Sequence, residues 1–379
     1  MRSVETADIV VIGAGIAGAS VAAELAETHE VIMLEMEAQP GYHTTGRSAA
    51  VFAPNSGPSG VRGLTRASRA FFDHPPEGFA QAPLLSPRQI LMIARDDQMG
   101  ALEDLYAVAV ESGAVELLSG PQLQATQPLL RDGYAVAGML DKGGKDIDVA
   151  SLHQGYLRKF KAAGGKLITK AAVETLERQG DTWVITTRQG QFEAPVVVNA
   201  AGAWAEEIGT IAGAEAIQLM PKRRTAMVVA EPEGFTQRDG PITIDIEEKF
   251  YLKPDAGRLL ISPADETPCD PCDVQPDETD VAICADRIMT AFALDIRRIE
   301  NKWAGLRSFV ADKEPVIGFS DIVPGFFWMA GQGGYGIQSA PAAGALACAL
   351  VQGKPVPEHI NSEGFDASQV APGRTGIAG

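Results

Sequence analysis

The chain has 379 residues, of which 45% are apolar and 21% are charged, and its mean hydropathy is zero. This balance is typical of a globular protein and excludes a disordered or low-complexity chain, and at ~150 residues per domain the length predicts about two domains. With 32 basic and 49 acidic side chains the net charge is −17, which argues against a nucleic acid or an anionic membrane as the main partner.

Cysteine usage and apolar segments indicate the compartment. Four cysteines are too few for a disulfide scaffold, which favours a reducing environment. Cys269 and Cys272 form a lone C-x-x-C without the second pair that a zinc site needs, so no metal site is expected. The chain starts without a signal-peptide pattern, and the apolar stretch 340–351 is too short to cross a bilayer. We therefore expect a soluble cytoplasmic protein without a transmembrane segment; a peripheral position on the cytoplasmic face of the inner membrane stays open.

The N-terminal elements predict a βαβ unit that binds a dinucleotide. Strand, turn, helix and second strand are expected over 8–12, 13–18, 19–27 and 31–34. In the G-x-G-x-x-G turn, Gly13 and Gly15 keep a Cβ away from a pyrophosphate, and Gly18 lets helix and strand pack closely. Ile16 and Ala17 between them complete the predicted phosphate-binding turn. Glu35 ends the second strand, where a carboxylate accepts ribose hydroxyls. This pattern does not decide between NAD and FAD.

Residues 39–58 form a loop rich in turn residues. It holds Thr44, Thr45, Gly46, Arg47 and Ser48 shortly after Glu35. Hydroxyl and guanidinium donors suit the phosphate and ribityl oxygens of an extended flavin dinucleotide, and a plain NAD dehydrogenase does not need them here. An ordinary polar loop is the alternative interpretation.

Further elements follow in chain order. Helices are predicted over 61–72, 98–110, 149–162 and 276–293, and strands over 89–94, 166–169, 173–178, 182–187 and 191–198. Asp148 has the position of an N-cap for helix 149–162. Residues 218–263 alternate like strands with Pro and Gly between them, and the tail after Asn361 is expected to be loose.

A second strand–turn–helix unit lies near the C-terminus, with strand 325–330, glycine turn 331–336 and helix 337–351. Backbone N–H groups and the helix dipole at such a turn would stabilise negative charge on a reduced flavin. A tight turn without a ligand is the alternative. The predicted cofactor contacts are Gly333, Gly334, Tyr335, Gly336, Ile337 and Gln338.

Dinucleotide-type signals at both ends, with a strand-rich middle, predict a discontinuous nucleotide domain with insertions. We place the first domain at 1–85, 146–215 and 305–379, and the second at 86–145 and 216–304. The predicted fold class is α/β (α+β overall).

Arginines in apolar surroundings are candidate anion ligands. Arg307 lies inside the apolar stretch 304–310, and strand alternation lets only one of Arg223 and Arg224 face inward. A buried guanidinium is costly unless it is paired, and a bidentate carboxylate from a substrate or from an internal Asp or Glu is its natural partner. A solvated charged face is the alternative.

Together these blocks resemble the D-amino-acid oxidase superfamily of FAD enzymes, and within it the bacterial D-arginine dehydrogenases. The most specific stretches are 37–50, 84–88, 153–158, 221–224, 250–257, 303–312 and 332–338. The resemblance implies that a Rossmann-type domain binds FAD non-covalently and that the FAD also contacts Val173, Ala201 and Gly202. It further implies an inserted substrate domain built on an antiparallel sheet. It implies that Arg224, Arg307 and Tyr251 hold the α-carboxylate of an amino acid and that the carbonyl of Gly334 holds its amine. Hydride would pass to flavin N5, with oxygen or a quinone as final acceptor.

Departures from the D-arginine group change the expected substrate. Val51 and Ser56 stand where that group has a histidine and a lid tyrosine, and Ile90 replaces an acid that grips the guanidinium. An unpaired buried charge costs about 3–5 kcal/mol, or roughly 10²–10³ in affinity, so D-arginine should be a poor substrate. The missing histidine also leaves no obvious side-chain base. The predicted pocket wall is Val51, Ser56, Ile90, Ile242, Ile244 and Gln338.

Three functions remain open at this point. The first is oxidation of a D-amino acid with an apolar or uncharged side chain. The second is oxidation of an N-substituted or secondary amino acid, of the sarcosine, opine or imino-acid type, as one subunit of a complex or alone. The third is an electron-relay flavoprotein without a substrate of its own, which the presence of Arg224, Tyr251 and Arg307 argues against. The sequence does not indicate an oligomeric state.

Overall fold

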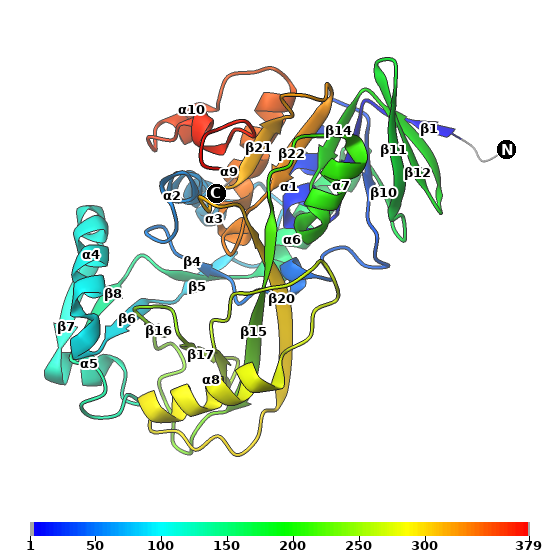
Figure 1. The fold of residues 1–379 in the computed structure, drawn as a ribbon. Coiled ribbons are helices and arrows are strands. Elements are labelled where there is room, and N and C mark those ends of the chain that lie inside the picture. The colour runs from blue at the N-terminus through cyan, green and yellow to red at the C-terminus, as the bar shows by residue number, and fades with distance from the viewer. Residues whose placement is uncertain (1–3, 378–379) are drawn as a thin grey trace.

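The computed structural model describes residues 4–377, which are built around a six-stranded sheet in the order β10-β3-β2-β14-β22-β21 (Figure 1). Its strands are β2 Ile9–Ile12, β3 Val31–Leu34, β10 Lys166–Ile168, β14 Val196–Asn199, β21 Val316–Phe319 and β22 Phe326–Ala330. Neighbours pair in parallel except β21 with β22. The chain leaves β2 for β3 on one side, and β14 pairs with β2 on the other, so the switch point where such sheets bind ligands lies beside β2.

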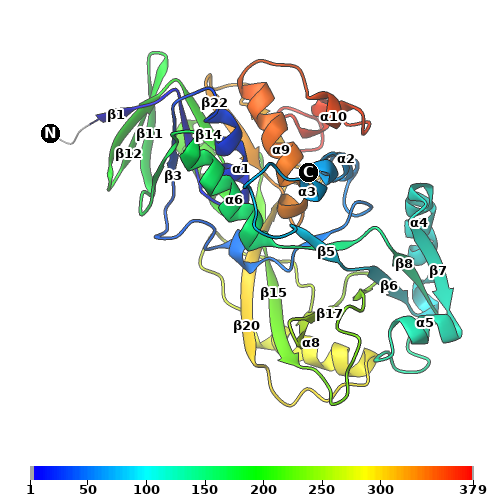
Figure 2. The same ribbon diagram turned by 180° about the vertical axis from the view of Figure 1, so that it is seen from behind.

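Both faces of this sheet are covered, which is why β2 is apolar throughout. Ile9 and Val11 belong to a core shared with three helices that lie side by side behind the sheet (Figure 2). These helices are α1 Ile16–Leu25, α6 Val149–Ala162 and α9 Gly336–Val351. Val10 and Ile12 belong to the opposite core, under a four-stranded sheet and α7 Ala205–Ala212. The four strands are β1 Val4–Thr6, β11 Val173–Gln179, β12 Thr182–Thr187 and β13 Gly190–Ala194.

The second large sheet has nine strands and forms the lower part of the molecule in Figure 1. Its strands are β6 Ile90–Ala94, β7 Val115–Ser119, β8 Ala137–Asp141, β15 Met220–Ala230, β16 Ile242–Asp245, β17 Tyr251–Asp255, β18 Arg258–Ser262, β19 Thr267–Pro268 and β20 Asn301–Phe309. Pairing is antiparallel except between β6 and β16. The long strands β15 and β20 pair over nine residues and rise toward the first sheet.

Shorter elements fill the space around and between the sheets. A three-stranded sheet consists of β4 Val51–Phe52, β9 Lys145–Ile147 and β5 Leu85–Pro87. The remaining α-helices are α2 Ser59–Ala67, α3 Arg69–Asp73, α4 Met99–Ala109, α5 Gly120–Thr126, α8 Glu278–Ala291 and α10 Glu358–Asn361. Short 3₁₀ turns are η1 Thr44–Arg47, η2 Asp96–Gln98, η3 Val110–Ser112, η4 Gly202–Trp204 and η5 Ala367–Val370.

The predicted fold class is confirmed, and most predicted elements are present. Asp148 caps α6, because its carboxylate accepts a hydrogen bond of 2.8 Å from the backbone N–H of Ser151. The strand predicted over 191–198 is two strands in different sheets, because Pro195 between them has no N–H to donate. The predicted domain boundary at 305 falls inside β20. The tail is not loose as expected, since Phe365 and Val370 are buried in the core with α2 and α9.

Two further findings concern the described chain as a whole. No helix within residues 4–377 has the length and apolar character needed to cross a membrane. Within the same residues, no group of three or more His, Cys, Asp or Glu side chains is arranged to hold a metal ion.

The glycine turn after β2 generates a stability prediction. A Cβ on Gly18 would lie 1.8 Å from the carbonyl oxygen of Gly13, whereas a Cβ on Gly100, in α4, would meet nothing within 4 Å. We expect Gly18→Ala to lower the free energy of unfolding by about 2 kcal/mol or more. Gly100→Ala should be neutral or stabilising by up to about 1 kcal/mol. Thermal unfolding of both variants checks this, and equal melting temperatures would contradict the assigned packing.

Candidate active site

Three cavities, A, B and C, follow one another from the switch point of the first sheet to the face of the second sheet. Cavity A opens at the carboxyl ends of β2, β3 and β14, cavity B lies between α1 and β20, and cavity C lies against β16 and β17. Cavities A and B share Gly15, Thr45 and Gly202 in their walls. Cavities B and C share Ser48, Arg224, Tyr251, Arg307 and Gly334.

Each glycine of the first turn is required for a different structural reason. Gly13 has a φ of +100°, and a Cβ there would lie 2.4 Å from the carbonyl oxygen of Ala200. A Cβ on Gly15 would meet only the Thr45 hydroxyl, at 3.1 Å, so Gly15 exposes bare backbone to cavities A and B. Ile16 and Ala17 also line cavity B. Gly18 lines neither cavity and is needed for the turn itself.

Glu35 is buried at the end of β3 and faces cavity A. One carboxylate oxygen accepts a hydrogen bond from the N–H of Ala14 (2.8 Å) and the other from the N–H of Glu37 (2.9 Å). Burial raises the pKa of Glu35, although these two donors act in the opposite direction. Because a carboxylate has about four acceptor sites, the group retains the capacity to accept ligand hydroxyls.

The loop 44–48 is bonded to its neighbours on both sides. The Thr45 hydroxyl accepts from the N–H of Ile16 (3.0 Å), and the Thr44 hydroxyl donates to the carbonyl of Leu306 in β20 (2.7 Å). Arg47 donates to the carbonyl of Ala304 (2.9 Å) and to Asp273 (2.5 Å). Thr44, Arg47 and Ser48 line cavity B, but the polar groups of Thr44 and Arg47 mainly tie this loop to the second sheet.

Gly46 and the second glycine turn shape the backbone around cavity B. A Cβ on Gly46 would lie 2.7 Å from the carbonyl oxygen of Gly41 behind the loop. The N–H of Gly333 donates to the carbonyl of Ser308 in β20 (3.0 Å), which fixes the turn against that strand. Gly333, Gly334, Gly336 and Ile337 line cavity B, as predicted for a cofactor-binding turn at the start of α9.

Buried polar atoms without partners gather around cavities B and C. Within residues 4–377, seven buried side-chain polar atoms have no hydrogen-bond partner, and four of them belong to residues that line these cavities. The four are Arg224 Nε, Ser308 Oγ, Gln332 Nε2 and Gln338 Nε2. Since buried polar groups normally have partners, these atoms indicate that a polar ligand completes the site.

Arg307 and Arg224 provide a concentration of positive charge. They lie diagonally on the paired strands β20 and β15, because Arg224 is opposite Gly305, two residues before Arg307. Arg224 donates to Glu266 (3.0 Å), but within residues 4–377 the Arg307 guanidinium has neither a carboxylate within 4.0 Å nor a hydrogen bond. Burial and the neighbouring Arg224 lower the pKa of Arg307. The pair therefore carries a positive charge that the surrounding side chains leave unneutralised.

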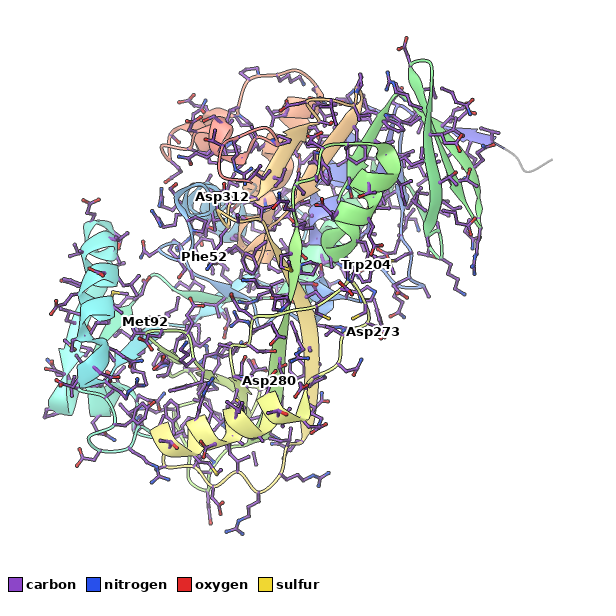
Figure 3. All side chains as sticks on the ribbon, viewed as in Figure 1. Phe52, Met92, Trp204, Asp273, Asp280 and Asp312 are labelled. Atoms are coloured by element: carbon purple, nitrogen blue, oxygen red, sulfur yellow. The ribbon has the colours of Figure 1, made fainter. Side chains whose placement is uncertain are left out.

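Arg223 faces the other side of β15, as strand alternation predicts. It donates to Asp280 (2.6 Å) and to Asp265 (3.3 Å). Asp280 is labelled on α8 in Figure 3. Arg223 is therefore a structural residue, while Arg224 faces the cavities.

The wall of cavity C combines apolar side chains with the charged groups of Arg224, Arg307 and Glu248. Val51, Ser56, Ile242, Ile244 and Gln338 line it as predicted, together with Ala264 and Tyr335. Ile90 is not among the residues that line cavity C; it lies beside Ile242 on the neighbouring strand β6, in a cluster with Ile242 and Tyr251. The ring of Tyr335, predicted as a cofactor contact, faces cavity C and lies next to Gly57.

Gly334 lies between cavities B and C. A Cβ there would approach the Arg307 guanidinium to 2.9 Å, so only glycine leaves this cation in place. The backbone of Gly334 is thereby exposed beside Arg307 and Tyr251, where the predicted carboxylate clamp is. The fold thus brings together the four predicted residues Arg224, Tyr251, Arg307 and Gly334, which are separated by up to 110 positions in the chain.

The comparisons with known proteins decide the family. The model of the DAO family, described as FAD dependent oxidoreductase, matches residues 8–350. The chain belongs to the DAO family of FAD-dependent oxidoreductases. Human mitochondrial dimethylglycine dehydrogenase is 32% identical over 151 residues, which cover 39% of this chain and 17% of that protein. The FAD-dependent oxidoreductase domain-containing protein 1 of Xenopus laevis is 26% identical over 92% of this chain and 79% of its own length.

Solved structures share the fold along the whole chain. Glycine oxidase from Geobacillus kaustophilus superposes with a TM-score of 0.85 at 23% identity, covering 98% of this chain and 99% of that one. L-proline dehydrogenase from P.horikoshii superposes with a TM-score of 0.80 at 22% identity, covering 96% and 97%. The predicted membership of the wider family is confirmed, while the narrower resemblance to D-arginine dehydrogenases stays a prediction.

Cavities A and B of this DAO-family chain fit the FAD that the family uses. Bare backbone at Gly13, Gly15 and Gly334 leaves room for a close approach, and the unpartnered Ser308 and Gln332 offer hydrogen bonds. At the outer end, three large apolar side chains line cavity A although they are exposed to solvent: Met36 at 38%, Tyr42 at 48% and Ile211 at 42%. A flat adenine ring would cover them.

Several residues of cavity A were missed by sequence reasoning. They are Met36, Tyr42, His43, Trp204 and Ile211, beside the predicted Val173, Ala201 and Gly202. The rings of His43 and Trp204 lie 4.7 Å apart, and Trp204 is labelled next to α7 in Figure 3. The one available signal was Trp204, an aromatic residue two positions after the glycine that ends the 196–202 strand and turn.

His153 beneath the first turn generates a pH prediction. Its Nε2 donates to the carbonyl of Ala14 (2.8 Å), and burial lowers its pKa although this bond acts in the opposite direction. Folded protein therefore keeps His153 neutral while the unfolded chain binds a proton below pH ~6.5. Stability from this residue is complete above the unfolded pKa and is lost as the pH falls, by up to about 1.4 kcal/mol per pH unit.

His153→Gln tests this linkage, because Gln can donate to Ala14 but does not titrate in this range. We expect the melting temperature of the variant to fall less than that of the wild type between pH 7.5 and 5.5, on the order of 1 kcal/mol less in free energy. Parallel pH profiles of the two proteins would show that His153 does not carry this dependence.

Proposed function

We propose that the chain oxidises a small amino acid at the bond between its α-carbon and its amine nitrogen, with a D-amino acid of apolar or uncharged side chain as substrate. The observation that carries the proposal is the Arg307 guanidinium, which has no carboxylate within 4.0 Å among residues 4–377 and lies beside the bare backbone of Gly334. A carboxylate is the ligand that a guanidinium binds in a bidentate manner. When bound, FAD supplies the hydride acceptor of this reaction.

Each part of cavity C has a role in this proposal. Arg307 and the Nε of Arg224 bind the substrate carboxylate, and the hydroxyl of Tyr251 can add a third donor. The carbonyl of Gly334 accepts from the amine. Two points of attachment fix which face of the α-carbon is presented to cavity B, and such orientation is a large part of catalysis.

The side chain of the substrate would extend along the apolar wall. Val51, Ile242 and Ile244 line this part of cavity C, and Ile90 packs beside Ile242 on the neighbouring strand. Burying a substrate group of this size contributes about 25 cal/mol per Å² of apolar surface removed from water. The wall therefore favours an apolar or uncharged group.

Among the residues that the structure describes, no histidine that could act as a base lines cavity C. Burial and the nearby carboxylate of Glu248 raise the pKa of Tyr335, so that its phenol stays protonated at neutral pH. We infer that the amine enters unprotonated or loses its proton to water. The rate at low substrate concentration should therefore rise with pH until the free substrate amine has lost its proton.

An N-substituted or secondary amino acid is the second candidate substrate. The specific observation is the small side chain of Ser56 in the wall of cavity C, which with Val51 leaves room beside the amine position. Dimethylglycine dehydrogenase is among the relatives, and iminodiacetate oxidase from Chelativorans sp. BNC1 shares the fold with a TM-score of 0.78. The same carboxylate clamp would serve either substrate.

Arg307→Met should lower kcat/KM by roughly 10²–10³-fold, mainly through KM, because an unpaired buried carboxylate costs about 3–5 kcal/mol. FAD content is expected to stay at the wild-type level. Arg223→Lys is the matched control, since Arg223 lies on β15 next to Arg224 but binds Asp280 on the opposite face. Steady-state kinetics measure kcat and KM for both variants. A KM for Arg307→Met equal to the wild-type value would show that Arg307 does not bind the substrate carboxylate.

The substrate class is tested by anaerobic mixing of FAD-loaded protein with single amino acids. Loss of the oxidised-flavin absorbance should be fastest with D-leucine, slower with glycine and absent with L-leucine. Faster bleaching by sarcosine than by any primary amino acid would favour the second candidate. Failure of every amino acid to bleach the flavin would contradict both. Repeating the reaction with oxygen and with a quinone identifies the electron acceptor.

A further inference from the structure

A surface segment, 269–274, crosses the cofactor loop and is here called the strap. Asp273 of the strap accepts from Arg47 (2.5 Å) and from the hydroxyl of Tyr42 (3.2 Å), and the carbonyl of Val274 accepts from Arg47 (3.3 Å). Val274 is buried in a small cluster with Ala203, Leu306 and Trp204. Asp273 is labelled on this segment in Figure 3. Since Tyr42 lines cavity A and Arg47 lines cavity B, the strap is bonded to the walls of both cavities that fit the FAD.

The strap carries two thiols that lie next to each other. Cys269 Sγ and Cys272 Sγ are 3.7 Å apart, Cys272 is exposed and Cys269 is half-buried. All four cysteines of the chain are free thiols, and the other two are separate: Cys284 is buried in the core under α8, and Cys348 lies on α9. A disulfide bond is about 2.05 Å long. The two sulfur atoms therefore need to approach by only ~1.6 Å, a distance that side-chain rotation can cover.

We propose that Cys269 and Cys272 form a reversible disulfide that fixes the strap and slows the release of FAD. The oxidant is a small-molecule disulfide such as glutathione disulfide. One cysteine thiolate attacks a sulfur of the oxidant, and a mixed disulfide forms as one small thiol leaves. The second cysteine then attacks the mixed disulfide, the intramolecular S–S bond forms and a second small thiol leaves. The protein loses two electrons and two protons, and the small disulfide becomes two thiols.

Burial and negative charge around the strap lower the fraction of Cys272 that is present as thiolate. Burial, the adjacent Cys269 thiol and the carboxylates of Asp273 and Asp270 raise the pKa of Cys272. Because the thiolate is the attacking species, exchange at neutral pH is slow.

The effect on FAD follows from the position of Asp273 directly after Cys272. The Arg47 guanidinium lowers the pKa of Asp273, so the ion pair between them is present at neutral pH. An exposed pair of this kind is weak alone, because the strap can move away and take Asp273 with it. A ring closed between residues 269 and 272 restricts that movement without breaking any bond to Arg47 or Tyr42.

The experiment compares the holoenzyme in its oxidised and reduced forms. Protein is equilibrated in buffers of defined ratios of glutathione to glutathione disulfide, free thiols are counted, and FAD release is followed by the fluorescence of free flavin after dilution. We expect oxidised protein to lose two titratable thiols and to release FAD roughly threefold or more slowly than reduced protein. No amino acid substrate is needed, so the result is independent of the proposed function.

Variants locate the effect. Cys269→Ser and Cys272→Ser should remove the difference between oxidising and reducing buffers, while Cys348→Ser, the control outside the strap, should keep it. Asp273→Asn should still form the disulfide but show a smaller difference in FAD release. Failure to lose two thiols, equal release rates from both forms of the wild type, or an unchanged difference in Cys272→Ser would each overturn the proposal.

Discussion

The site is organised by positive charge that the protein leaves without a partner. Lys222, Arg224 and Arg307 lie on one face of the paired strands β15 and β20, and Glu266 accepts from the first two of them only. Burial opposes ionisation of Glu266, but the bonds from Lys222 and the charge of Arg224 keep its pKa below the ordinary value. Arg307 is only partly exposed, and within residues 4–377 it has no carboxylate within 4.0 Å. A guanidinium with little access to water and no counter-ion is energetically unfavourable. A bound carboxylate would remove the unfavourable free energy of the unpaired Arg307 guanidinium. This gain is the physical basis of the proposed carboxylate specificity.

The same two strands explain why the cation is held so firmly. β15 and β20 pair over nine residues, and the cofactor loop and the second glycine turn both bond to β20 on either side of Arg307. Thr44 donates to the carbonyl of Leu306, and Gly333 donates to the carbonyl of Ser308. Arg307 therefore lies between two anchors that also shape cavity B. A single strand, β20, therefore carries Arg307 and anchors both of the loops that line cavity B.

Much of this arrangement was predictable from the sequence, for identifiable reasons. The turn at Gly13 and Gly18 follows from steric rules that allow no side chain there, and the cap at Asp148 follows from local hydrogen bonding. Arg307 was recognisable as a guanidinium in an apolar strand. These signals are local, because each depends on residues within one turn or one strand.

What the sequence did not reveal depends on contacts between distant segments. Ile90 was expected in the pocket wall, but it is not among the residues that line cavity C, and the parallel pairing of β6 with β16 places it beside Ile242. The ion pair of Arg47 with Asp273 joins residues that are 226 positions apart, and no local pattern indicates it. The exposed apolar side chains around cavity A become meaningful only when the cavity is seen. Arg224 was correctly expected to face inward, but its bond to Glu266 depends on the course of a separate loop.

The proposed clamp residues and the apolar side chains of cavity C come from different elements, and this has a consequence for how such enzymes diversify. The groups that would hold the reacting centre all come from β15, β17, β20 and the turn before α9, whereas Val51, Ser56, Ile242 and Ile244 come from a short edge strand, its loop and β16. New specificities can therefore arise by exchanging a few side chains on these other elements while the residues of the clamp are kept. A directed-evolution library confined to those four positions would sample substrates without risking the oxidation step.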